Sequence, residues 1–595
     1  MENIIIKTFQ DTKNNESKKK IFLGLHCNSY DYTERKIYDF KISKKHHWDD
    51  YNVFIKDNDY LEKLYDRLLE SLSTSLNKFH ACKKSKLYWE MILGPWLIYF
   101  CTNIFDRWKN IEQLSPNKSF STEINGSLKK FLISNDIQEY KTVLTSETYN
   151  HYIFSKILVF LKDKEKIKIE FFKTNRNFDD DIPIRIKKKS NKKVIFKTFI
   201  RNFIIKMFKF LTINQKILIS RNYLSAIQNL KINLRLFQIP ALYPIDINFQ
   251  SLPNNKKREN FIFSFEHKNL FENFLAHELI NHLPKVFMEK FDSMNKFVEN
   301  SNLSKKPKLI FLTNFFSNTF LSFYCAKKRE DGSKLILSQH GGCYGQYDRH
   351  WSENFEIKIS NKFLTYGWEN LKYENKTYPF GIIKNINLSY GKNFKNNDKL
   401  LFIVRSRSKF INKLDSSARS NQSYDYLNNC YDFLHRLNKS LKGKTLVRLR
   451  DNDLGWAEHP RFLKEFPNLE YDFGVNNIFK LMDSSRIVVS TSLSTSYLES
   501  LMMNIPTVVI SNYNLEPMRK DAKEYLNLLI QSKILHFSPE SAAKHIEQVW
   551  ENIDDWWLSK QVQENINKFC LKYAKKVKNI EKEIIKIINL NINVQ

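Results

Sequence analysis

Glycine, paired cysteines and long apolar runs are scarce in this sequence. Only 13 of the 595 residues are glycine, and the seven cysteines are scattered without a CxxC pair. An odd number of scattered cysteines supports neither a disulfide framework nor a zinc site, and it fits a reducing compartment. We therefore expect a cytoplasmic protein that does not depend on disulfides.

Targeting, membrane-spanning and nucleotide-hydrolysis signals are also missing. Residues 1–20 are polar and charged, with no apolar segment typical of a secretory signal. The most apolar window, Met91–Phe105, is too short to span a bilayer and contains Pro95. No GxxxxGK[ST] loop occurs, which argues against ATP or GTP hydrolysis. Without an HExxH motif or clustered carboxylates, we expect no metal and no cofactor.

The sequence has a large excess of basic residues. Its formal net charge is +31 and its pI is about 9.5. This charge favours an anionic partner such as nucleic acid, a membrane surface or a phosphorylated substrate. A biased genome that places Lys at surface positions is the alternative. No RRM, KH or helix-turn-helix signature is present, so nucleic acid is not an expected partner.

Strands alternate with helices in two successive series, which predicts parallel sheets covered on both faces. The first series has strands at Lys308–Leu312, Leu335–Leu337 and Phe363–Tyr366. The second has strands at Lys399–Val404, Thr445–Leu449, Arg486–Val489 and Thr507–Ile510. We expect an α/β protein with two Rossmann-like domains facing across a cleft. Residues 1–390 form an acceptor-side domain with large helical and basic insertions. Residues 391–595 form a nucleotide-binding domain with closing helices.

The most distinctive stretch is Leu335–Gly345, an apolar run followed by Ser-Gln-His and a glycine pair. It predicts a buried strand that ends in a tight loop. Ligand sites of open α/β sheets lie at the carboxyl ends of strands, and imidazole titrates near neutral pH. His340 is therefore predicted to be a catalytic base, with a structural histidine as the alternative. Gln339, Gly341 and Gly342 are predicted to line the same cleft.

A Ser/Thr-rich helix start is predicted to form the opposite wall of the cleft. In Val488–Val509 an apolar strand leads into two Ser-Thr-Ser-like groups before a helix. Free N–H groups at a helix N-terminus bind phosphate, and Glu499 could accept hydrogen bonds from a ribose. Plain helix capping with a surface glutamate is the alternative. The residues predicted here to bind the phosphate and ribose of a nucleotide donor are Ser492, Ser494, Thr495, Ser496 and Glu499.

Arginines follow two of the predicted strands. Arg405 and Arg407 come after the first strand of the second series, and Arg448 and Arg450 lie at the end of the next. Guanidinium groups pair with phosphate or carboxylate in a bidentate manner, so we predict contacts to the donor. Solvated surface arginines are the alternative.

The sequence also predicts the structure or the role of three segments in the N-terminal half. Tyr88–Trp108 is dense in aromatic residues and predicts a buried helix pair broken at Pro95, with Arg107 in the cleft as the functional alternative. Ile21–Leu25 predicts a first strand that is followed by a loop, where His26 is also expected in the cleft. The segment Lys192–Leu211 places cations among Ile and Phe, which suits either an anionic membrane surface or packing on the domain.

Several motifs together resemble a family of large bacterial transferases associated with O-antigen, lipopolysaccharide and surface-polysaccharide gene clusters. The resemblance runs nearly from end to end. The matching residues are Tyr88-Trp89, Leu93–Leu97, Asp106–Trp108, Gln339–Gly342 with Gly345, Tyr366–Trp368, Ser494-Thr495 with Leu498-Glu499, Asn504–Thr507 and Trp556-Trp557.

The C-terminal half also resembles GT-B glycosyltransferases and CDP-polyol phosphotransferases. This resemblance implies a peripheral or cytoplasmic enzyme that transfers a sugar from a nucleotide-sugar donor to a glycan or lipid-linked acceptor. A CMP-activated acidic sugar is the preferred donor. A CDP-polyol-type phosphotransferase is one alternative function. A non-catalytic basic protein on a membrane or nucleic acid is the other.

Overall fold

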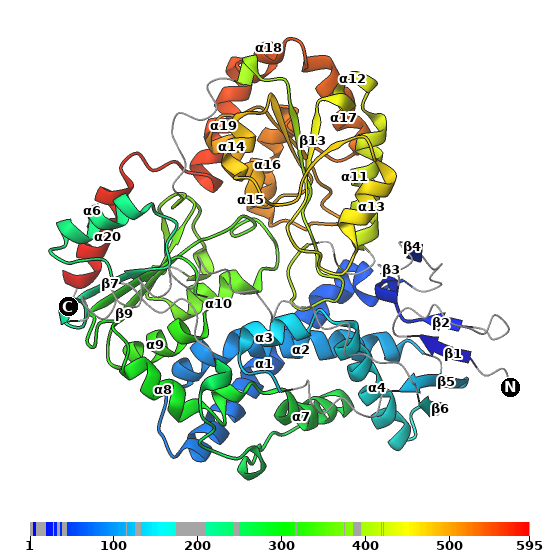
Figure 1. Cartoon of the computed structure of the whole chain (residues 1–595), viewed down its shortest axis with the longest axis vertical. Helices are drawn as coiled ribbons and strands as arrows, with labels where there is room; N and C mark the ends of the chain where they lie inside the picture. Colours follow the sequence, from blue (N-terminus) through cyan, green and yellow to red (C-terminus); the bar gives the residue numbers. More distant parts are fainter. Residues whose placement is uncertain are drawn as a thin grey trace.

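Parallel strands form three separate sheets in the described part of the chain (Figure 1). The computed structural model describes residues 4–7, 20–27, 29–31, 36–38, 45–114, 116–124, 133–173, 210–241, 249–315, 318–373, 375–384, 394–417, 419 and 422–593. Apart from a short antiparallel hairpin of β3 (Ser29–Asp31) and β4 (Lys36–Tyr38), all strand pairs in these ranges are parallel.

The C-terminal sheet has six strands in the order β14-β13-β12-β15-β16-β17. Numbered along the chain from its first strand, this is the 3-2-1-4-5-6 order of a doubly wound Rossmann sheet. The order reverses between β12 and β15, and the crevice at such a switch point is where ligands bind. The strands are β12 (Leu400–Ile403), β13 (Thr445–Arg448), β14 (Glu470–Asp472), β15 (Ile487–Ser490), β16 (Thr507–Ile510) and β17 (Leu535–His536).

Helices cover both faces of this sheet (Figure 1). One group packs α11 against α17, and the other packs α15 and α16 against α19. Their bounds are α11 (Gln422–Arg436), α12 (Lys439–Gly443), α13 (Glu458–Glu465), α14 (Ile478–Asp483), α15 (Thr495–Met502), α16 (Lys520–Gln531), α17 (Pro539–Val549), α18 (Ile553–Trp557) and α19 (Lys560–Tyr573).

The second sheet has five strands in the order β11-β10-β9-β8-β7. Strands β8 and β9 are apolar runs buried on both faces, as expected for a covered parallel sheet. The strands are β7 (Ile217–Ser220), β8 (Leu309–Leu312), β9 (Lys334–Ser338), β10 (Lys362–Thr365) and β11 (Thr377–Pro379). The neighbouring helices are α6 (Ala226–Arg235), α8 (Phe291–Glu299), α9 (Thr319–Glu330), α10 (Trp351–Ile359) and α20 (Ile580–Asn593).

The N-terminal part adds a third sheet and a helical layer. Its strands follow the order β2-β1-β5-β6. They are β1 (Ile4–Lys7), β2 (Lys20–Phe22), β5 (Ser119–Ile124) and β6 (Lys168–Lys173). The helices are α1 (Tyr51–His80), α2 (Lys86–Glu112), α3 (Ile137–Val143), α4 (Glu147–Asp163) and α7 (Leu270–His282). The predicted α/β fold, with parallel sheets and N-terminal helical additions, is confirmed.

Two helix predictions need correction. Tyr88–Trp108 forms part of one continuous helix, α2, rather than a helix pair. Pro95 removes one backbone hydrogen bond, but α2 is buried between other helices that hold it together. At Gly94 an added Cβ would lie 2.5 Å from the Tyr65 hydroxyl, so the helix packs closely there. The sequence of residues 271–291 also predicts one amphipathic helix, but this segment divides near Pro284, and α7 and α8 lie on either side of the break.

The last helix returns to the first half of the chain. Helix α20 lies beside α6 on the β7–β11 sheet (Figure 1). Ile584, Ile587 and Ile588 join an apolar cluster with Leu309 and Ile336 of that sheet. The structure therefore places α20 with the N-terminal half, although it follows residue 390. Residues 385–393 lie outside the described residues, so the domain boundary at 390 stays a prediction.

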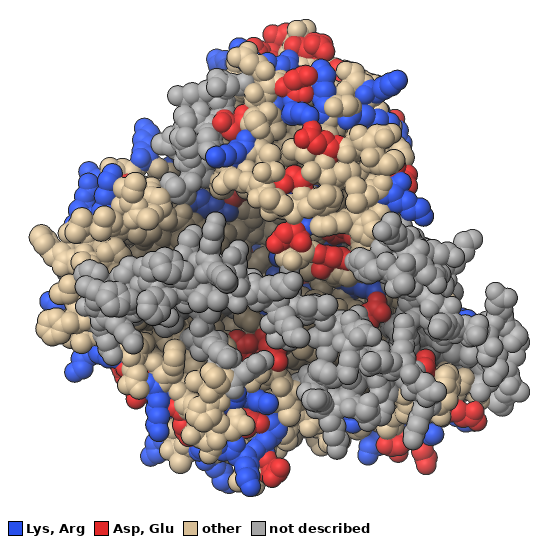
Figure 2. All heavy atoms as spheres, viewed as in Figure 1, with Lys and Arg blue, Asp and Glu red and all other residues tan. Residues whose placement is uncertain are grey.

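The basic segment and the overall charge are only partly described. Residues 174–209 lie outside the described ranges, and with them lies most of the predicted basic helix Lys192–Leu211. On the described part of the face in Figure 2, Lys and Arg are interspersed with Asp and Glu. Among the residues that the structure describes, none of the helices combines the length and apolar character needed to cross a bilayer.

Truncating Ile588 to Ala should destabilise the protein because it leaves a cavity between α20 and the β7–β11 sheet. We expect the free energy of unfolding, measured in urea, to fall by roughly 2–5 kcal/mol. Leu590 on the same helix is 54% exposed, so Leu590→Ala should change it by less than about 0.5 kcal/mol. Equal losses in both variants would contradict the packing of α20.

Candidate functional site

A cavity of about 980 Å³ lies between the β7–β11 sheet and the C-terminal sheet. We call it the cleft. Loops after β9, β12, β13 and β15 contribute to its walls, and β12 and β15 flank the switch point. The structure brings together most of the predicted site residues. Those that line the cleft are His340, Gly341, Gly342, Arg405, Arg448, Arg450, Ser492, Ser494, Thr495, Ser496 and Glu499.

The loop after β9 touches the start of α15 directly. The backbone N–H of Gly342 donates to the Thr495 Oγ1 at 2.8 Å. A Cβ at position 342 would lie 2.4 Å from the carbonyl carbon and oxygen of Ser494. Only glycine allows the two backbones to approach this closely. His340 and Ser494, which are far apart in sequence, therefore lie on the same cleft.

His340 faces a buried glutamate. Its Nδ1 lies 3.6 Å from Oε2 of Glu356, an oxygen that also accepts the Tyr344 hydroxyl at 2.9 Å. Burial raises the pKa of Glu356 to about 8, so this carboxyl group is protonated at neutral pH. A neutral carboxyl group supplies little charge to stabilise an imidazolium on His340.

The His340 ring is uncharged at neutral pH. Although 23% of its side chain is exposed, the surrounding protein desolvates the ring and lowers its pKa to about 3. The neighbouring His350, Lys413 and Lys384 lower it further. A neutral imidazole keeps a lone pair with which to accept a proton.

The start of α15 presents hydroxyl groups and backbone amides to the cleft. Ser494 is the N-cap residue, and in the described structure its side chain caps no backbone N–H of the first turn. Its Oγ instead accepts a hydrogen bond from the Ser492 hydroxyl at 3.0 Å. The hydroxyl groups of Ser490 and Ser496 are hydrogen-bonded to each other at 2.8 Å. The amides of this turn keep the positive partial charge that attracts anions.

Glu499 lies one turn further along α15 and pairs with a lysine from the other half. Its Oε1 forms an ion pair with the Lys384 ammonium, which also lies 5.4 Å from the centre of the Tyr223 ring. Lys384, Tyr223 and Glu499 all line the cleft. This ion pair links the two halves at the wall of the cleft.

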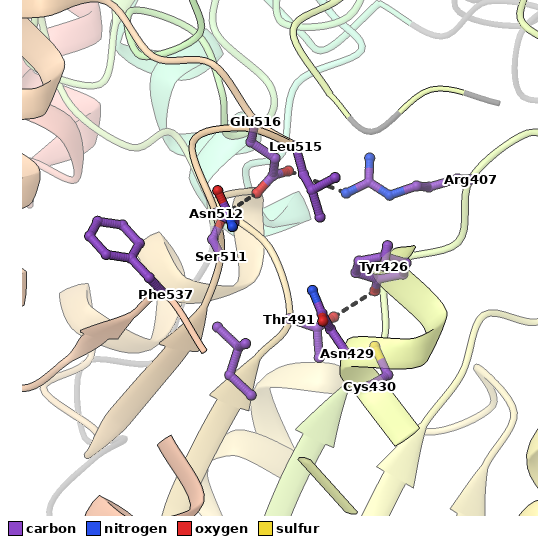
Figure 3. A pocket seen from close by; sticks show the side chains of 11 residues that line it. Arg407, Tyr426, Asn429, Cys430, Thr491, Ser511, Asn512, Leu515, Glu516 and Phe537 are labelled. Carbon is purple, nitrogen blue, oxygen red and sulfur yellow. Dashed lines mark hydrogen bonds and ion pairs between the residues drawn. The ribbon is translucent and has the colours of Figure 1, made fainter. Parts of the chain in front are cut away.

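The four predicted arginines take different positions. Arg405 donates to the Tyr347 hydroxyl at 2.6 Å and to Glu516 at 3.1 Å. Arg448 is ion-paired with Asp472, and Arg450 is exposed. Arg407 does not line the cleft. It donates to Glu516 at 3.3 Å and borders a small pocket of about 20 Å³ (Figure 3). That pocket has room for about one water molecule, not for a nucleotide.

Three other cleft predictions are wrong. Gln339 is buried behind the loop, where its Oε1 accepts from Trp368 Nε1 at 2.8 Å and its Nε2 donates to the Gly341 carbonyl at 2.8 Å. It shapes the loop without lining the cleft. His26 is buried and stacks on Phe154.

Arg107 is fully buried in the helical layer. It donates to the Asn150 Oδ1 at 2.6 Å and to the Asp106 carboxylate at 2.6 Å. The sequence pattern of a charged residue beside aromatic residues fits this buried ion pair as well as a cleft position. Tertiary packing decides between them.

Several charged residues around the cleft were not predicted from the sequence. Lys384, Lys413 and Asp415 line the cleft, and Glu356 lies beside His340. Glu516 accepts a hydrogen bond from Arg405. A signal for Glu356 was present: Glu353 and Glu356 are three residues apart in a segment that also contains Trp and Phe, so they share a helix face near apolar residues. Glu516 lies in a loop without any such pattern.

The structure also gathers a group with the spacing of metal ligands, which the sequence did not reveal. Ligand atoms of His46, His47 and Asp106 lie within 4.8 Å of one another. His46 accepts the Trp48 N–H at Nδ1, so its other ring nitrogen donates to Asp106 at 2.8 Å. Burial opposes the charge on Asp106, but Arg107 and His46 outweigh it and lower the pKa of this carboxyl. His46 and Asp106 thus form a buried hydrogen-bonded pair, and Nε2 of His47 lies 3.6 Å from the same carboxylate oxygen.

The fold and the site define an α/β protein with a basic, polar cleft between two parallel sheets. The chain matches the LIC12162 family transferase model over residues 3–588, and it belongs to this family. The predicted resemblance to a transferase family is confirmed. No curated protein sequence matches the chain.

Solved structures show weak similarity. HepE of Anabaena, in complex with UDP-glucose, is 9% identical over 63% of this chain and 99% of its own, with a TM-score of 0.33. The pneumococcal O-GlcNAc transferase GtfA, in complex with UDP and GlcNAc, is 11% identical over 50% and 59%, with a TM-score of 0.30. WaaG, a glycosyltransferase involved in lipopolysaccharide biosynthesis, is 13% identical over 54% and 84%, with a TM-score of 0.24. These low TM-scores leave the function to be argued from the chain's own site.

Replacing Gly342 with Ala should push the loop after β9 away from α15. The added methyl group would meet rigid backbone atoms of Ser494, so we expect the free energy of unfolding to fall by about 1–3 kcal/mol. Gly341→Ala is the matched control, because its Cβ would lie 3.5 Å from the Thr495 Oγ1, an ordinary contact. Urea unfolding of both variants checks this, and an equally stable Gly342→Ala variant would contradict the close approach.

Burial of Glu356 should make stability fall as pH rises. Its pKa is raised from 4.5 to about 8. The contribution of this carboxyl group to the free energy of unfolding is therefore complete below pH 4.5 and is lost as pH rises through 8. Glu356→Gln keeps the neutral form. At pH 9 this variant should be more stable than the natural protein, by on the order of a few kcal/mol.

Glu353→Gln is the contrasting control in the same pH series. Glu353 is equally buried, but it pairs with Arg519 at 2.7 Å and accepts the Gly345 N–H at 2.7 Å. Loss of this carboxylate in Glu353→Gln should destabilise the protein at pH 6 and at pH 9. Thermal unfolding at both pH values measures the difference, and a Glu356→Gln variant that is less stable at pH 9 would overturn the assignment.

Proposed function

We propose that this transferase is a glycosyltransferase that uses a nucleotide-sugar donor. The observation that carries the proposal is the joining of His340 and the α15 start in one cleft at the switch point of a doubly wound sheet. A Rossmann-type crevice holds a nucleotide, and a histidine on the opposite wall can act on the group attached to it.

The donor would be held mainly by the C-terminal half. Amides at the start of α15 and the guanidinium of Arg405 suit the donor phosphate. The Glu499 carboxylate suits the ribose hydroxyl groups, which donate hydrogen bonds to it. Because Arg405, Arg450 and Lys384 already line the cleft, positive side chains can neutralise the phosphate, and we propose that transfer proceeds without a metal ion.

His340 would act as the general base. Its neutral ring accepts the proton of an acceptor hydroxyl while that oxygen bonds to the anomeric carbon of the donor sugar. The bond from the anomeric carbon to the phosphate oxygen breaks, and the nucleotide leaves with the electron pair. A bound phosphate would offset the positive charge of Lys384 and Lys413, and it would thereby raise the pKa of His340 toward a useful range.

The acceptor would be a surface polysaccharide or a lipid-linked glycan, and the donor a CMP-activated acidic sugar. The motif at Gln339–Gly342 and the one at Ser494–Glu499 support this choice, because they resemble transferases of surface-polysaccharide gene clusters. We propose that the enzyme works in the cytoplasm, at the inner face of the membrane.

A screen of nucleotides combined with a His340→Ala variant tests the proposal. CMP-, CDP-, UDP- and GDP-linked donors are compared by the shift in melting temperature, and we expect one nucleotide class to raise it by several degrees. His340→Ala should keep that shift, because the side chain is not needed to hold the nucleotide. Its turnover of the donor should fall by about 10²–10⁴-fold.

His267→Ala is the matched control, since His267 is an exposed histidine away from the cleft. Its turnover should equal that of the natural protein. Unchanged turnover in His340→Ala would disprove the role of this base. If no nucleotide shifts the melting temperature while anionic vesicles or RNA bind tightly, the protein is a basic binding protein instead. Release of a polyol phosphate product would identify a phosphotransferase.

A further inference from the structure

A second cavity of about 500 Å³ opens beside the cleft. It shares five lining residues with the cleft, so the two spaces adjoin: Arg405, Ser406, Lys413, Asp415 and Arg450. We call it the side chamber. Its far wall consists of Tyr99 on α2 and Gln138, Lys141 and Thr142 on α3, which belong to the N-terminal helical layer. Its other walls are the loops after β12 and β13.

Basic side chains dominate the side chamber. Six basic residues line it, against two acidic ones. The basic residues are Lys141, Arg405, Arg407, Lys413, Arg419 and Arg450. Both acidic residues are engaged by the protein. Asp415 pairs with Lys413 at 2.6 Å and accepts the Trp351 N–H, while Asp453 accepts the N–H groups of Gly455 and Ala457.

Two arginines of the chamber share a single carboxylate. Arg405 and Arg407 both contact Oε1 of Glu516, at 3.1 and 3.3 Å. Figure 3 shows the contact of Arg407 with this carboxylate. Burial opposes ionisation of Glu516, but the two guanidinium groups outweigh it and lower its pKa. One negative charge thus faces two positive ones. In the described part of the chain, the buried Nε of Arg407 has no hydrogen-bond partner.

Arg419 is only 4% exposed, yet its hydrogen bonds go to neutral groups. Its guanidinium donates to the carbonyl oxygens of Ser417 and Trp48 and lies 4.1 Å from the centre of the Phe54 ring. Its Nε also lacks a hydrogen-bond partner among the described residues. Burial lowers its pKa to about 10, so it remains charged at neutral pH. Holding a buried cation beside other cations costs free energy that a bound anion would recover.

We propose that the side chamber binds an anionic group of the acceptor, either a carboxylate or a phosphate. This inference rests on the proposed function, in which the cleft holds the donor. The side chamber is a separate space whose far wall comes from the N-terminal half, opposite the sheet that would hold the nucleotide. Guanidinium groups pair with both kinds of oxyanion in a bidentate manner.

The uncharged lining suits a sugar next to that anion. Tyr99 offers an aromatic ring, and Gln138, Thr142 and Thr145 offer amide and hydroxyl groups that can bond to sugar hydroxyls. Lys141 lies 5.0 Å from the centre of the Tyr99 ring, so its charge stands at the edge of this uncharged lining. An acidic glycan unit or a glycan phosphate would meet both sets of groups.

Binding of small anionic probes tests the proposal without the acceptor itself. Methyl β-glucuronoside supplies a carboxylate, inorganic pyrophosphate supplies phosphate, and methyl β-glucoside is the neutral counterpart. Calorimetry is performed on the full chain, first alone and then with the nucleotide that raises its melting temperature. We expect at least one anionic probe to bind in both states, and the neutral glycoside to bind at least tenfold more weakly.

Substitutions then place the probe in the chamber. Lys141→Gln and Lys141→Glu should weaken anion binding at least threefold and tenfold respectively, and Arg419→Met at least tenfold. Arg436→Met is the control, because Arg436 is a surface residue of α11 that lines neither space. Lys141 lies at a partly exposed position outside the cleft, so its variants remain informative if Arg419→Met fails to fold.

The outcomes separate this inference from the proposed function. Anion binding that is unaffected by the Lys141 and Arg419 substitutions would overturn the inference, as would equal binding of the neutral glycoside. If these substitutions weaken nucleotide binding to the same degree, the anionic group belongs to the donor and the inference is wrong. If no nucleotide binds but the probes still depend on Lys141, the donor proposal fails while an anion site in the chamber stands.

Discussion

The close approach of Gly342 to Ser494 and Thr495 is the contact on which the site depends. It joins the carboxyl end of β9 in one sheet to the carboxyl end of β15 in the other. A side chain at position 342 would separate these ends, because the atoms it would meet are backbone atoms that cannot rotate away. The cleft therefore has its shape because one position in the chain carries no Cβ.

Further contacts from the same loop extend this junction. Gln346 accepts the backbone N–H of Arg519 through its carbonyl at 2.8 Å, and the Asp348 N–H donates to the carbonyl of Pro517 at 3.1 Å. Tyr347 donates its hydroxyl to Glu516 at 2.6 Å, the carboxylate that also holds Arg405 and Arg407. The loop that carries His340 thus also contacts the carboxylate that holds Arg405 and Arg407. Residues from distant parts of the chain are thus held together by one set of hydrogen bonds.

The sequence predicted the strands that carry the site but not every residue in it. Strands such as β8, β9, β15 and β16 are apolar runs buried on both faces, a pattern visible without a structure. Short strands such as β14 and β17 have no such pattern, since their neighbours in the sheet define them. His26 and Arg107 show the limit for side chains. A polar residue beside aromatic residues fits a cleft and a buried network equally well, and only long-range packing decides which one forms.

The electrostatics of the cleft link the state of His340 to what the cleft contains. After desolvation, the neighbouring groups that lower the pKa of His340 are His350, Lys413 and Lys384. Lys413 and Lys384 line the cleft, where an anionic ligand would lie close to them. An anion there would cancel part of their effect, because opposite charges nearby favour the protonated ring. The neighbouring Glu356 cannot do this at neutral pH, since its own carboxyl group is protonated. Under the proposed function, His340 would gain basicity when a phosphate binds, so proton transfer would be coupled to the presence of the donor.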